Sequence, residues 1–178
     1  MAPGATHLVG VSGGGDASAR EISLAEEFGA AVAAAGAVVV CGGLGGVMEA
    51  CARGAVQAGG TTIGILPGDH AGAANRWITY PIVTGMGQAR NVILVHTSRV
   101  LVAIGGAYGT LSEVALALKI GVPVGLLASW MPQREGVAAP CLARFTTAAE
   151  AAAWALAGAR DAERHAGGGA AASPAGAP

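Results

Sequence analysis

The sequence predicts an α/β domain in which a parallel β-sheet lies between two layers of helices. Strand-like and helix-like segments alternate along the chain, which is typical of βαβ units whose crossover helices pack on the sheet. The segment 37–41 (AVVVC) is apolar at every residue, as expected for a parallel strand that is covered on both faces. Three of the predicted strands run directly into glycine clusters. We therefore predict a single-domain, three-layer α/β sandwich.

The boundaries of the predicted elements follow from capping residues and glycines. Ser18 and Glu21 have the spacing of a capping box, which starts the first helix, and Gly36 ends it. Gly59 and Gly121 end the second and fourth helices in the same way. The predicted strands span 7–12, 37–41, 61–66, 78–83, 99–104 and 122–127, and the predicted helices span 19–35, 47–58, 86–97, 110–120 and 147–158.

Composition indicates one folded domain over residues 1–158, excludes disorder for most of the chain and argues against nucleic-acid binding. Of the 178 residues only 12% are charged and 53% are hydrophobic, which excludes disorder for most of the chain. A net charge of -1 argues against an electrostatic nucleic-acid binder, which normally shows a basic excess. After residue 158 no large apolar residue follows, so we predict a disordered Gly/Ala/Pro-rich tail over 159–178.

The sequence predicts a soluble, cytoplasmic protein with no membrane partner. The uncharged stretch 28–48 is long enough to span a bilayer, but it is mostly Ala and Gly and ends in a glycine loop. No basic leader precedes an apolar stretch at the N-terminus, so we expect no signal peptide. Cys41, Cys51 and Cys141 form no CxxC motif and are predicted to be small buried side chains instead of metal ligands.

The glycine clusters predict a binding site for a phosphorylated ligand at the carboxyl ends of the strands, where parallel sheets bind ligands. Glycine lets the backbone approach a ligand closely, and the helix that follows directs free N–H groups at an anion. The alternative is that the glycines only shorten the turns of a chain rich in Ala and Gly. The predicted binding residues of the three clusters are Gly13, Gly14, Gly42, Gly43, Gly45, Gly46, Gly105, Gly106, Tyr108, Gly109 and Thr110.

Two of these clusters share one pattern. The segment 42–49 (GGLGGVME) aligns with 106–113 (GAYGTLSE) at both outer glycines and at the glutamate, so we expect both loops to line a single crevice. The first cluster lacks the full dinucleotide fingerprint, and no GKS or GKT follows any glycine loop. These observations favour a mononucleotide or a sugar phosphate as the ligand.

Glu113, Glu49 and Arg90 are the candidate chemical groups. An ionised Glu113 beside a bound sugar would stabilise a positively charged transition state or accept a proton from water. The structural alternative is a capping box, because Thr110 precedes Glu113 by three residues, and Glu49 carries the same two alternatives. A cation is disfavoured at the start of a helix, so Arg90 is expected to pair with Glu113 or with a phosphate.

Four motifs in order resemble those of one superfamily. The segment 105–113 (GGAYGTLSE) resembles the PGGxGTxxE signature of the Lonely Guy (LOG) family, the cytokinin-activating phosphoribohydrolases, and 86–90 resembles its arginine motif. Together with 41–50 (CGGLGGVMEA), 64–68 (GILPG) and 84–91 (TGMGQARN), the pattern is most similar to a bacterial branch that includes the molybdenum-cofactor carrier proteins. The resemblance spans about residues 7–128.

The resemblance implies a Rossmann-like fold and a homodimer or homotetramer that binds a small phosphorylated ligand. For the LOG family it implies hydrolysis of the N-glycosidic bond of a nucleoside 5′-monophosphate to free base and ribose 5-phosphate, without metal or required cofactor. Arg90 and Glu113 would then be the catalytic pair, and Gly106, Gly109 and Thr110 would hold the phosphate.

For the carrier proteins the resemblance implies a second function, in which a phosphate-bearing pterin, the molybdenum cofactor, is bound without turnover. This chain has Gly105, Ala107 and Asn91 where the LOG motifs have Pro, Gly and Lys. The sequence therefore predicts a LOG-like protein that binds a nucleotide or another phosphorylated ligand. Two alternatives stay open for the bound ligand: the protein hydrolyses it, or holds it in a non-catalytic role as carrier or sensor.

Overall fold

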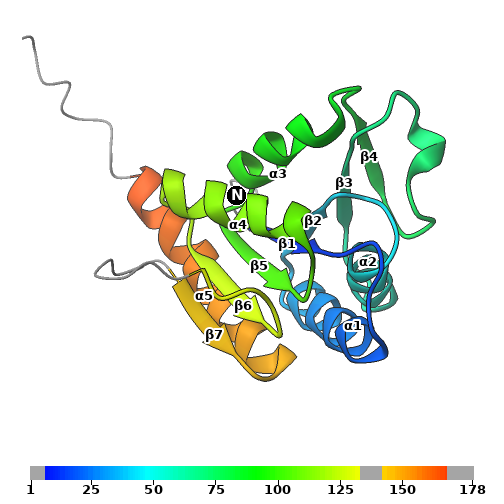
Figure 1. Ribbon diagram of the computed structural model, residues 1–178. Helices are drawn as coiled ribbons and strands as arrows, with labels where there is room; N and C mark the ends of the chain where they lie inside the picture. The colour runs from blue at the N-terminus through cyan, green and yellow to red at the C-terminus, as the bar shows by residue number, and fades with distance from the viewer. Residues whose placement is uncertain (1–6, 133–141, 168–178) are drawn as a thin grey trace, which may run out of the picture.

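Seven parallel strands form one sheet at the centre of the molecule (Figure 1). This computed structural model describes residues 7–132 and 142–167. Every neighbouring pair of strands is parallel, so all carboxyl ends meet at one edge of the sheet. In spatial order the strands are β4 (Tyr80–Val83), β3 (Thr62–Leu66), β2 (Val38–Cys41), β1 (Leu8–Gly13), β5 (Val100–Ile104), β6 (Val124–Leu127) and β7 (Leu142–Phe145).

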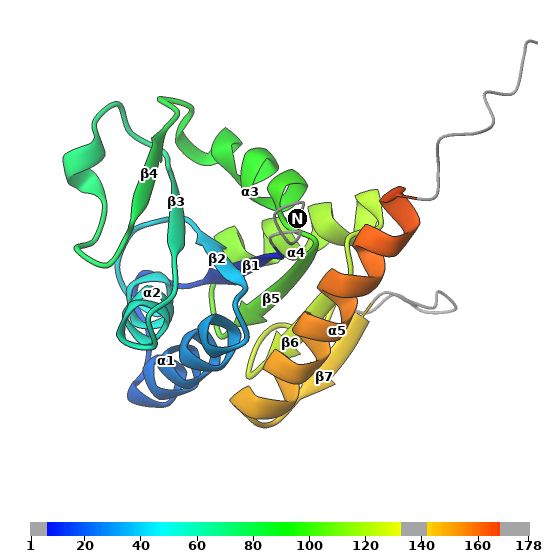
Figure 2. The ribbon, with the colours of Figure 1, turned by 180° about the vertical axis from the view of Figure 1, so that it is seen from behind.

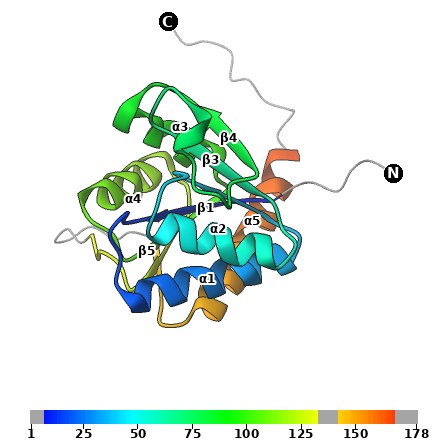
Figure 3. The same ribbon diagram turned by 90° about the vertical axis from the view of Figure 1, so that its right-hand side faces the viewer.

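Helices cover both faces of the sheet, as Figures 2 and 3 show. One layer consists of α1 (Ala19–Ala34), α2 (Val47–Gln57) and α5 (Ala148–Gly167), and the other consists of α3 (Asn91–Thr97) and α4 (Tyr108–Ile120). Two short 3-10 helices, η1 (Ala71–Ala73) and η2 (Gly87–Arg90), lie in the connections before β4 and α3. The predicted three-layer, Rossmann-like α/β sandwich is confirmed.

The central strands are buried on both faces because successive side chains point to opposite layers. In β1, Val9 and Val11 belong to the core beneath α1, α2 and α5. In β5, Val102 joins that same core, whereas Leu101 and Ala103 belong to the core beneath α3 and α4. This double burial explains why the strands are apolar at nearly every residue.

The predicted start and end of α1 are confirmed. The hydroxyl of Ser18 accepts a hydrogen bond from the N–H of Glu21, and the N–H of Ser18 donates to the Glu21 carboxylate at 2.7 Å. Gly36 has a φ of 80° just after the helix, which is the conformation expected of a glycine at this position. Cys41 and Cys51 are buried free thiols, and Cys141 lies outside the described residues.

Strand β7 and the length of α5 differ from the prediction. The sequence of β7 (LARF) shows no apolar run, because this edge strand is only partly buried. Helix α5 continues to Gly167, so the predicted tail boundary at residue 159 lies inside the helix. Its packing on the sheet uses small residues such as Ala155 and Ala159, both fully buried, together with the partly buried Trp154 and Leu156. The rest of the predicted tail, 168–178, lies outside the described residues.

Two other predicted helices start or divide differently. The predicted helix 86–97 is divided into η2 and α3, and the helix predicted to start at residue 110 starts at Tyr108. In the described part of the chain, no helix combines the length and the apolar character needed to cross a membrane.

Helices α1 and α2 approach closely because each has a glycine at the contact. A Cβ atom on Gly29 would collide with the carbonyl oxygen of Cys51, and one on Gly54 would collide with the carbonyl oxygen of Glu26. Since both obstacles are backbone atoms, no change of rotamer relieves them. The two glycines therefore set the distance between the helices.

Replacing Gly29 by alanine is expected to lower the free energy of unfolding by about 1–3 kcal/mol, because the helices must separate to admit the methyl group. Urea unfolding followed by circular dichroism measures this loss. Gly68→Ala is the matched control, because nothing lies within 4 Å of a Cβ atom at Gly68. Equal stability of the two variants would contradict the close packing of α1 on α2.

Candidate functional site

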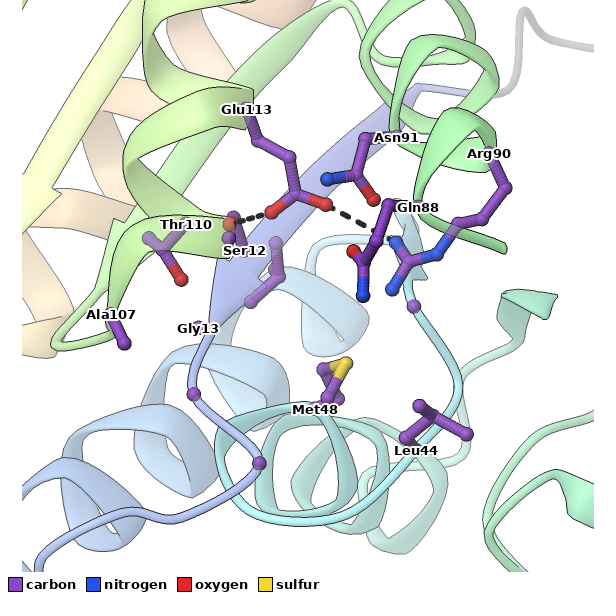
Figure 4. A pocket seen from close by; sticks show the side chains of 15 residues that line it. Ser12, Gly13, Leu44, Met48, Gln88, Arg90, Asn91, Ala107, Thr110 and Glu113 are labelled. Carbon is purple, nitrogen blue, oxygen red and sulfur yellow. Dashed lines mark hydrogen bonds and ion pairs between the residues drawn. The ribbon is translucent and has the colours of Figure 1, made fainter. Parts of the chain in front are cut away.

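A cavity of about 250 Å³ opens at the carboxyl edge of the sheet, where β1 and β5 lie side by side (Figure 4). The strand order reverses between these two strands, and such a reversal is where open parallel sheets bind ligands. The cavity is lined by Val11, Ser12, Gly13, Gly14, Gly15, Gly42, Leu44, Met48, Gln88, Arg90, Asn91, Ala107, Gly109, Thr110 and Glu113.

Glu113 is the acidic group of this cavity. It lies beyond the first turn of α4 and is only 6% exposed. Its Oε2 accepts a hydrogen bond from the hydroxyl of Ser12 in β1, and its Oε1 accepts one of 3.2 Å from Nη1 of Arg90 (Figure 4). Segments that are far apart in the sequence thus converge on one carboxylate.

Arg90 is held in the wall of the cavity and is 7% exposed. Its guanidinium group lies against the backbone of Gly42, where a Cβ atom would collide with Nη2 and lie 2.8 Å from the sulfur of Met48. Position 42 must therefore be glycine if the guanidinium is to reach Glu113. The Nε of Arg90 and the Oδ1 of Asn91 are buried without a hydrogen-bond partner among the described residues.

The environments of three titratable groups near the site differ. Burial raises the pKa of Glu113 above the ordinary glutamate value, although the Ser12 hydrogen bond and the Arg90 charge oppose this rise. The pKa of Glu21 is lowered, chiefly because the N–H of Ser18 donates a hydrogen bond to its carboxylate. Burial raises the pKa of the Cys41 thiol to about 11, so this thiol stays protonated at neutral pH.

The N-terminal starts of helices α2 and α4 differ in how their N–H groups are used. At α2, the N–H of Val47 donates to the carbonyl of Gly14 at 3.0 Å, so the loop after β1 already occupies this donor. At α4, Gly109 and Thr110 line the cavity, and N–H groups in the first turn of a helix have no intrahelical acceptor. An anion at this edge is therefore expected to bind the start of α4.

The structure brings together only part of the predicted site. The predicted residues that line the cavity are Gly13, Gly14, Gly42, Arg90, Gly109, Thr110 and Glu113. Those that lie outside its lining are Gly43, Gly45, Gly46, Glu49, Gly105, Gly106 and Tyr108. As expected, the two loops with one sequence pattern do reach a single cavity, through Gly42 and Leu44 on one side and Ala107 and Gly109 on the other.

Glu49 and Glu113 are aligned in sequence but not in structure. Helix α2 begins at Val47, so Glu49 is its third residue, whereas α4 begins at Tyr108 and Glu113 is its sixth. Because α4 starts three residues earlier relative to the shared pattern, Glu113 lies one turn further into its helix than Glu49, and only Glu113 lines the cavity. The capping-box alternative for Glu113 is wrong, since Ala107 caps α4 and Glu113 turns into the cavity.

Gly105 and Gly106 shape the loop between β5 and α4 and are not part of the cavity wall. Gly105 has a φ of 53°, which proline cannot adopt, and a Cβ atom there would collide with the Glu21 carboxylate. This geometry explains why the chain has Gly105 where the LOG signature has Pro. Tyr108 is 78% exposed and its ring lies 5.6 Å from that of Trp130, between centroids, outside the cavity.

Several lining residues are not among the predicted site residues, above all Ser12, Gln88 and Asn91. Ser12 directly precedes the first glycine cluster at the end of a strand, and this position was the available signal. In the described ranges 7–132 and 142–167, no three His, Cys, Asp or Glu side chains are grouped so that they could hold a metal ion.

The fold and the converging glycine loops define a Rossmann-like α/β protein of the superfamily that contains the LOG and molybdenum-cofactor carrier proteins. Within it, the model of the SLOG cluster4 family matches residues 6–153, and the chain belongs to this family.

Similar proteins include two with solved structures. The molybdenum cofactor binding protein of Rippkaea orientalis is 41% identical with a TM-score of 0.68, covering 72% of this chain and 80% of that one. The molybdenum cofactor carrier protein of Chlamydomonas reinhardtii is 36% identical with a TM-score of 0.76, covering 86% and 98%. An uncharacterized protein of Archaeoglobus fulgidus is 45% identical over 119 residues, which are 67% of this chain and 78% of the relative.

The carboxyl group of Glu113 is expected to titrate above the ordinary glutamate value, and that of Glu21 below it, in ¹³C NMR spectra of the side-chain carboxyl carbons. Arg90→Met should raise the pKa of Glu113 further, because the opposing charge is removed. Because the pKa of Glu113 is raised, the folded state holds this proton at pH values at which the unfolded state has released it. The free energy of unfolding therefore falls as pH rises from the ordinary glutamate pKa to the raised one.

Glu113→Gln should remove this part of the pH dependence of stability, while Glu21→Gln should not. A Glu113 carboxyl that titrates at or below Glu21 would contradict the buried environment described for it.

Proposed function

We propose that this protein binds a phosphorylated small molecule in the cavity between β1 and β5 and carries it without turnover, the molybdenum cofactor being the proposed ligand. The observation that carries the proposal is the convergence of a buried arginine, a helix start with free N–H groups and bare glycine backbone on one cavity. The similarity to two proteins named for binding or carrying the molybdenum cofactor supports this choice of ligand.

The phosphoryl group would lie between the start of α4 and Arg90. The N–H groups of Gly109 and Thr110 and the positive end of the α4 dipole favour an anion there. A guanidinium adds charge-assisted hydrogen bonds in a planar fork that suits phosphate oxygens. At about 250 Å³ the cavity is small for a ligand pocket, so the remaining part of the ligand would extend toward the mouth.

Glu113 fits a role in holding this arrangement. Both of its oxygens are engaged, one by Ser12 and the other by Arg90. The carboxylate thereby fixes the guanidinium and balances its charge before any ligand arrives. In a carrier this is sufficient, because no bond of the ligand is broken.

Protein produced in a host that synthesises the molybdenum cofactor is expected to retain molybdenum and a fluorescent pterin through mild purification. Arg90→Gln should lower the affinity about 10- to 100-fold, since a hydrogen bond to a charged group contributes about 1.5–3 kcal/mol. Arg99→Gln is the control, because Arg99 is exposed at the opposite edge of the sheet. Elemental analysis and pterin fluorescence of the three proteins measure the ligand.

Wild-type protein that is folded but holds neither molybdenum nor pterin, and that binds no added molybdenum cofactor, would contradict the proposed ligand. Equal loss of ligand in Arg90→Gln and Arg99→Gln would contradict the proposed position of the phosphoryl group.

Hydrolysis of a nucleoside 5′-monophosphate is the second candidate function, and the raised pKa of Glu113 favours it. A buried carboxyl group with a raised pKa suits proton transfer near neutral pH, and this one lines the cavity. The test is the release of free base and ribose 5-phosphate from a panel of nucleoside 5′-monophosphates. A hydrolase would release base with the wild type and lose this activity in Glu113→Gln. The carrier function predicts no release from any of them.

A further inference from the structure

A second cavity, also of about 250 Å³, lies at the carboxyl ends of β6 and β7. Because the strands are parallel, it opens at the same edge of the sheet as the cavity between β1 and β5. Arg144 enters it from β7, where it is paired with Leu126 of β6, and Arg20 enters it from the first turn of α1. Its lining residues are Arg20, Leu126, Ala128, Ser129, Arg144, Phe145 and Thr146, and it shares none with the first cavity.

Both charged residues that line this second cavity are positive, and the Glu150 carboxylate, which is not in its lining, accepts a hydrogen bond from the lining residue Thr146. Arg20 and Arg144 are its charged lining residues, and neither forms an ion pair with another described residue. Glu21, the carboxylate next to Arg20 in sequence, caps α1 through Ser18 and does not line the cavity. The Arg20 guanidinium is disfavoured by the dipole at the start of α1, and it carries the same charge as the Arg144 guanidinium. An anion between the two guanidinium groups would offset both repulsions.

The backbone at this cavity is also unusual. Ala128 has a φ of 51°, and it is the one non-glycine residue with a positive φ in the described part of the chain. Left-handed backbone at a residue with a Cβ atom is disfavoured and gathers at functional sites. The next residues hold this segment in place, since the Ser129 hydroxyl donates to the Gly105 carbonyl at 2.6 Å and Trp130 Nε1 donates to the Gly106 carbonyl at 3.0 Å.

We propose that the second cavity is a binding site for a phosphoryl group, held between the guanidinium groups of Arg20 and Arg144. The hydroxyl protons of Ser129 and Thr146 already bond to Gly105 and Glu150, so these oxygens are left to accept hydrogen bonds. The ligand class that matches is a phosphorylated molecule with its own hydroxyl or N–H donors. This site stands independently of the proposed carrier function.

The phosphoryl group has two sources, a separate small anion or a second phosphoryl group at the far end of a molecule bound in the first cavity. Both cavities adjoin the β5–α4 loop: Ala107 and Gly109 line the first, while Ser129, which lines the second, bonds to Gly105. The same recognition chemistry serves either source. The experiment therefore tests binding first and the source second.

The test is an amide chemical-shift titration of the ¹⁵N-labelled protein with inorganic phosphate. We expect the amides of Ala128, Ser129 and Thr146 to shift, and the affinity obtained from these shifts to fall at least about tenfold in Arg144→Gln. Arg99→Gln is the control, and it should retain the wild-type affinity. Both arginines are exposed, so neither replacement is expected to affect folding, which thermal unfolding checks.

Arg90→Gln separates this proposal from the proposed function. If phosphate still shifts the amides of the second cavity in Arg90→Gln, the site binds a separate anion, and the proposal holds even where the first cavity has lost its ligand. If those amides shift only when the molybdenum cofactor is added and Arg90 is present, the second cavity contacts another part of that ligand, whose phosphoryl group lies at Arg90, and the proposed phosphoryl site is overturned. Amides at Ala128, Ser129 and Thr146 that respond to neither probe, or that respond equally in Arg144→Gln, would overturn the proposal.

Discussion

The buried ion pair between Glu113 and Arg90 is the interaction on which the rest of the site depends. Two charged groups that are more than nine-tenths buried are costly to desolvate, and each is tolerated because the other lies beside it. The pair joins η2 to α4, and the hydrogen bond from Ser12 adds β1 to the same cluster. Gly42 is part of this arrangement, because the guanidinium occupies the space where a side chain would be. The binding cavity is therefore organised before any ligand enters.

The topology of the sheet explains why this cluster forms where it does. The chain adds strands on one side of β1 from β2 to β4, and then returns to add β5 on the other side. The loops that follow β1 and β5 therefore lead away from each other at the carboxyl ends of these two adjacent strands. The loop between β2 and α2 is occupied at Gly46 by the backbone of Gly14, which follows β1, whereas the loop between β5 and α4 presents the start of α4 to the cavity. This asymmetry gives two similar sequence motifs different surroundings: the first packs against the loop after β1, and the second leaves the start of its helix at the cavity.

Much of the fold and the location of the site could be predicted from the sequence, because both follow from local patterns. Apolar strands, the Ser18 capping box and the glycine clusters each depend on neighbouring residues alone. The direction of Glu113 could not be predicted, since it depends on α4 starting at Tyr108 instead of Thr110. The role of Ser12 could not be predicted either, because it depends on a contact with Glu113, about a hundred residues away in the sequence. Strand β7 could not be predicted because it lacks the apolar run that identifies buried strands.

The central claim is that backbone N–H groups at the start of α4, together with Arg90, hold the phosphoryl group of a ligand in the cavity between β1 and β5. A crystal structure of the protein purified with its ligand retained measures this most directly. The account predicts phosphate oxygens within hydrogen-bond distance of the N–H groups of Gly109 or Thr110 and of the Arg90 guanidinium. A ligand whose phosphoryl group lies elsewhere, with Arg90 bonded to Glu113 alone, would contradict it.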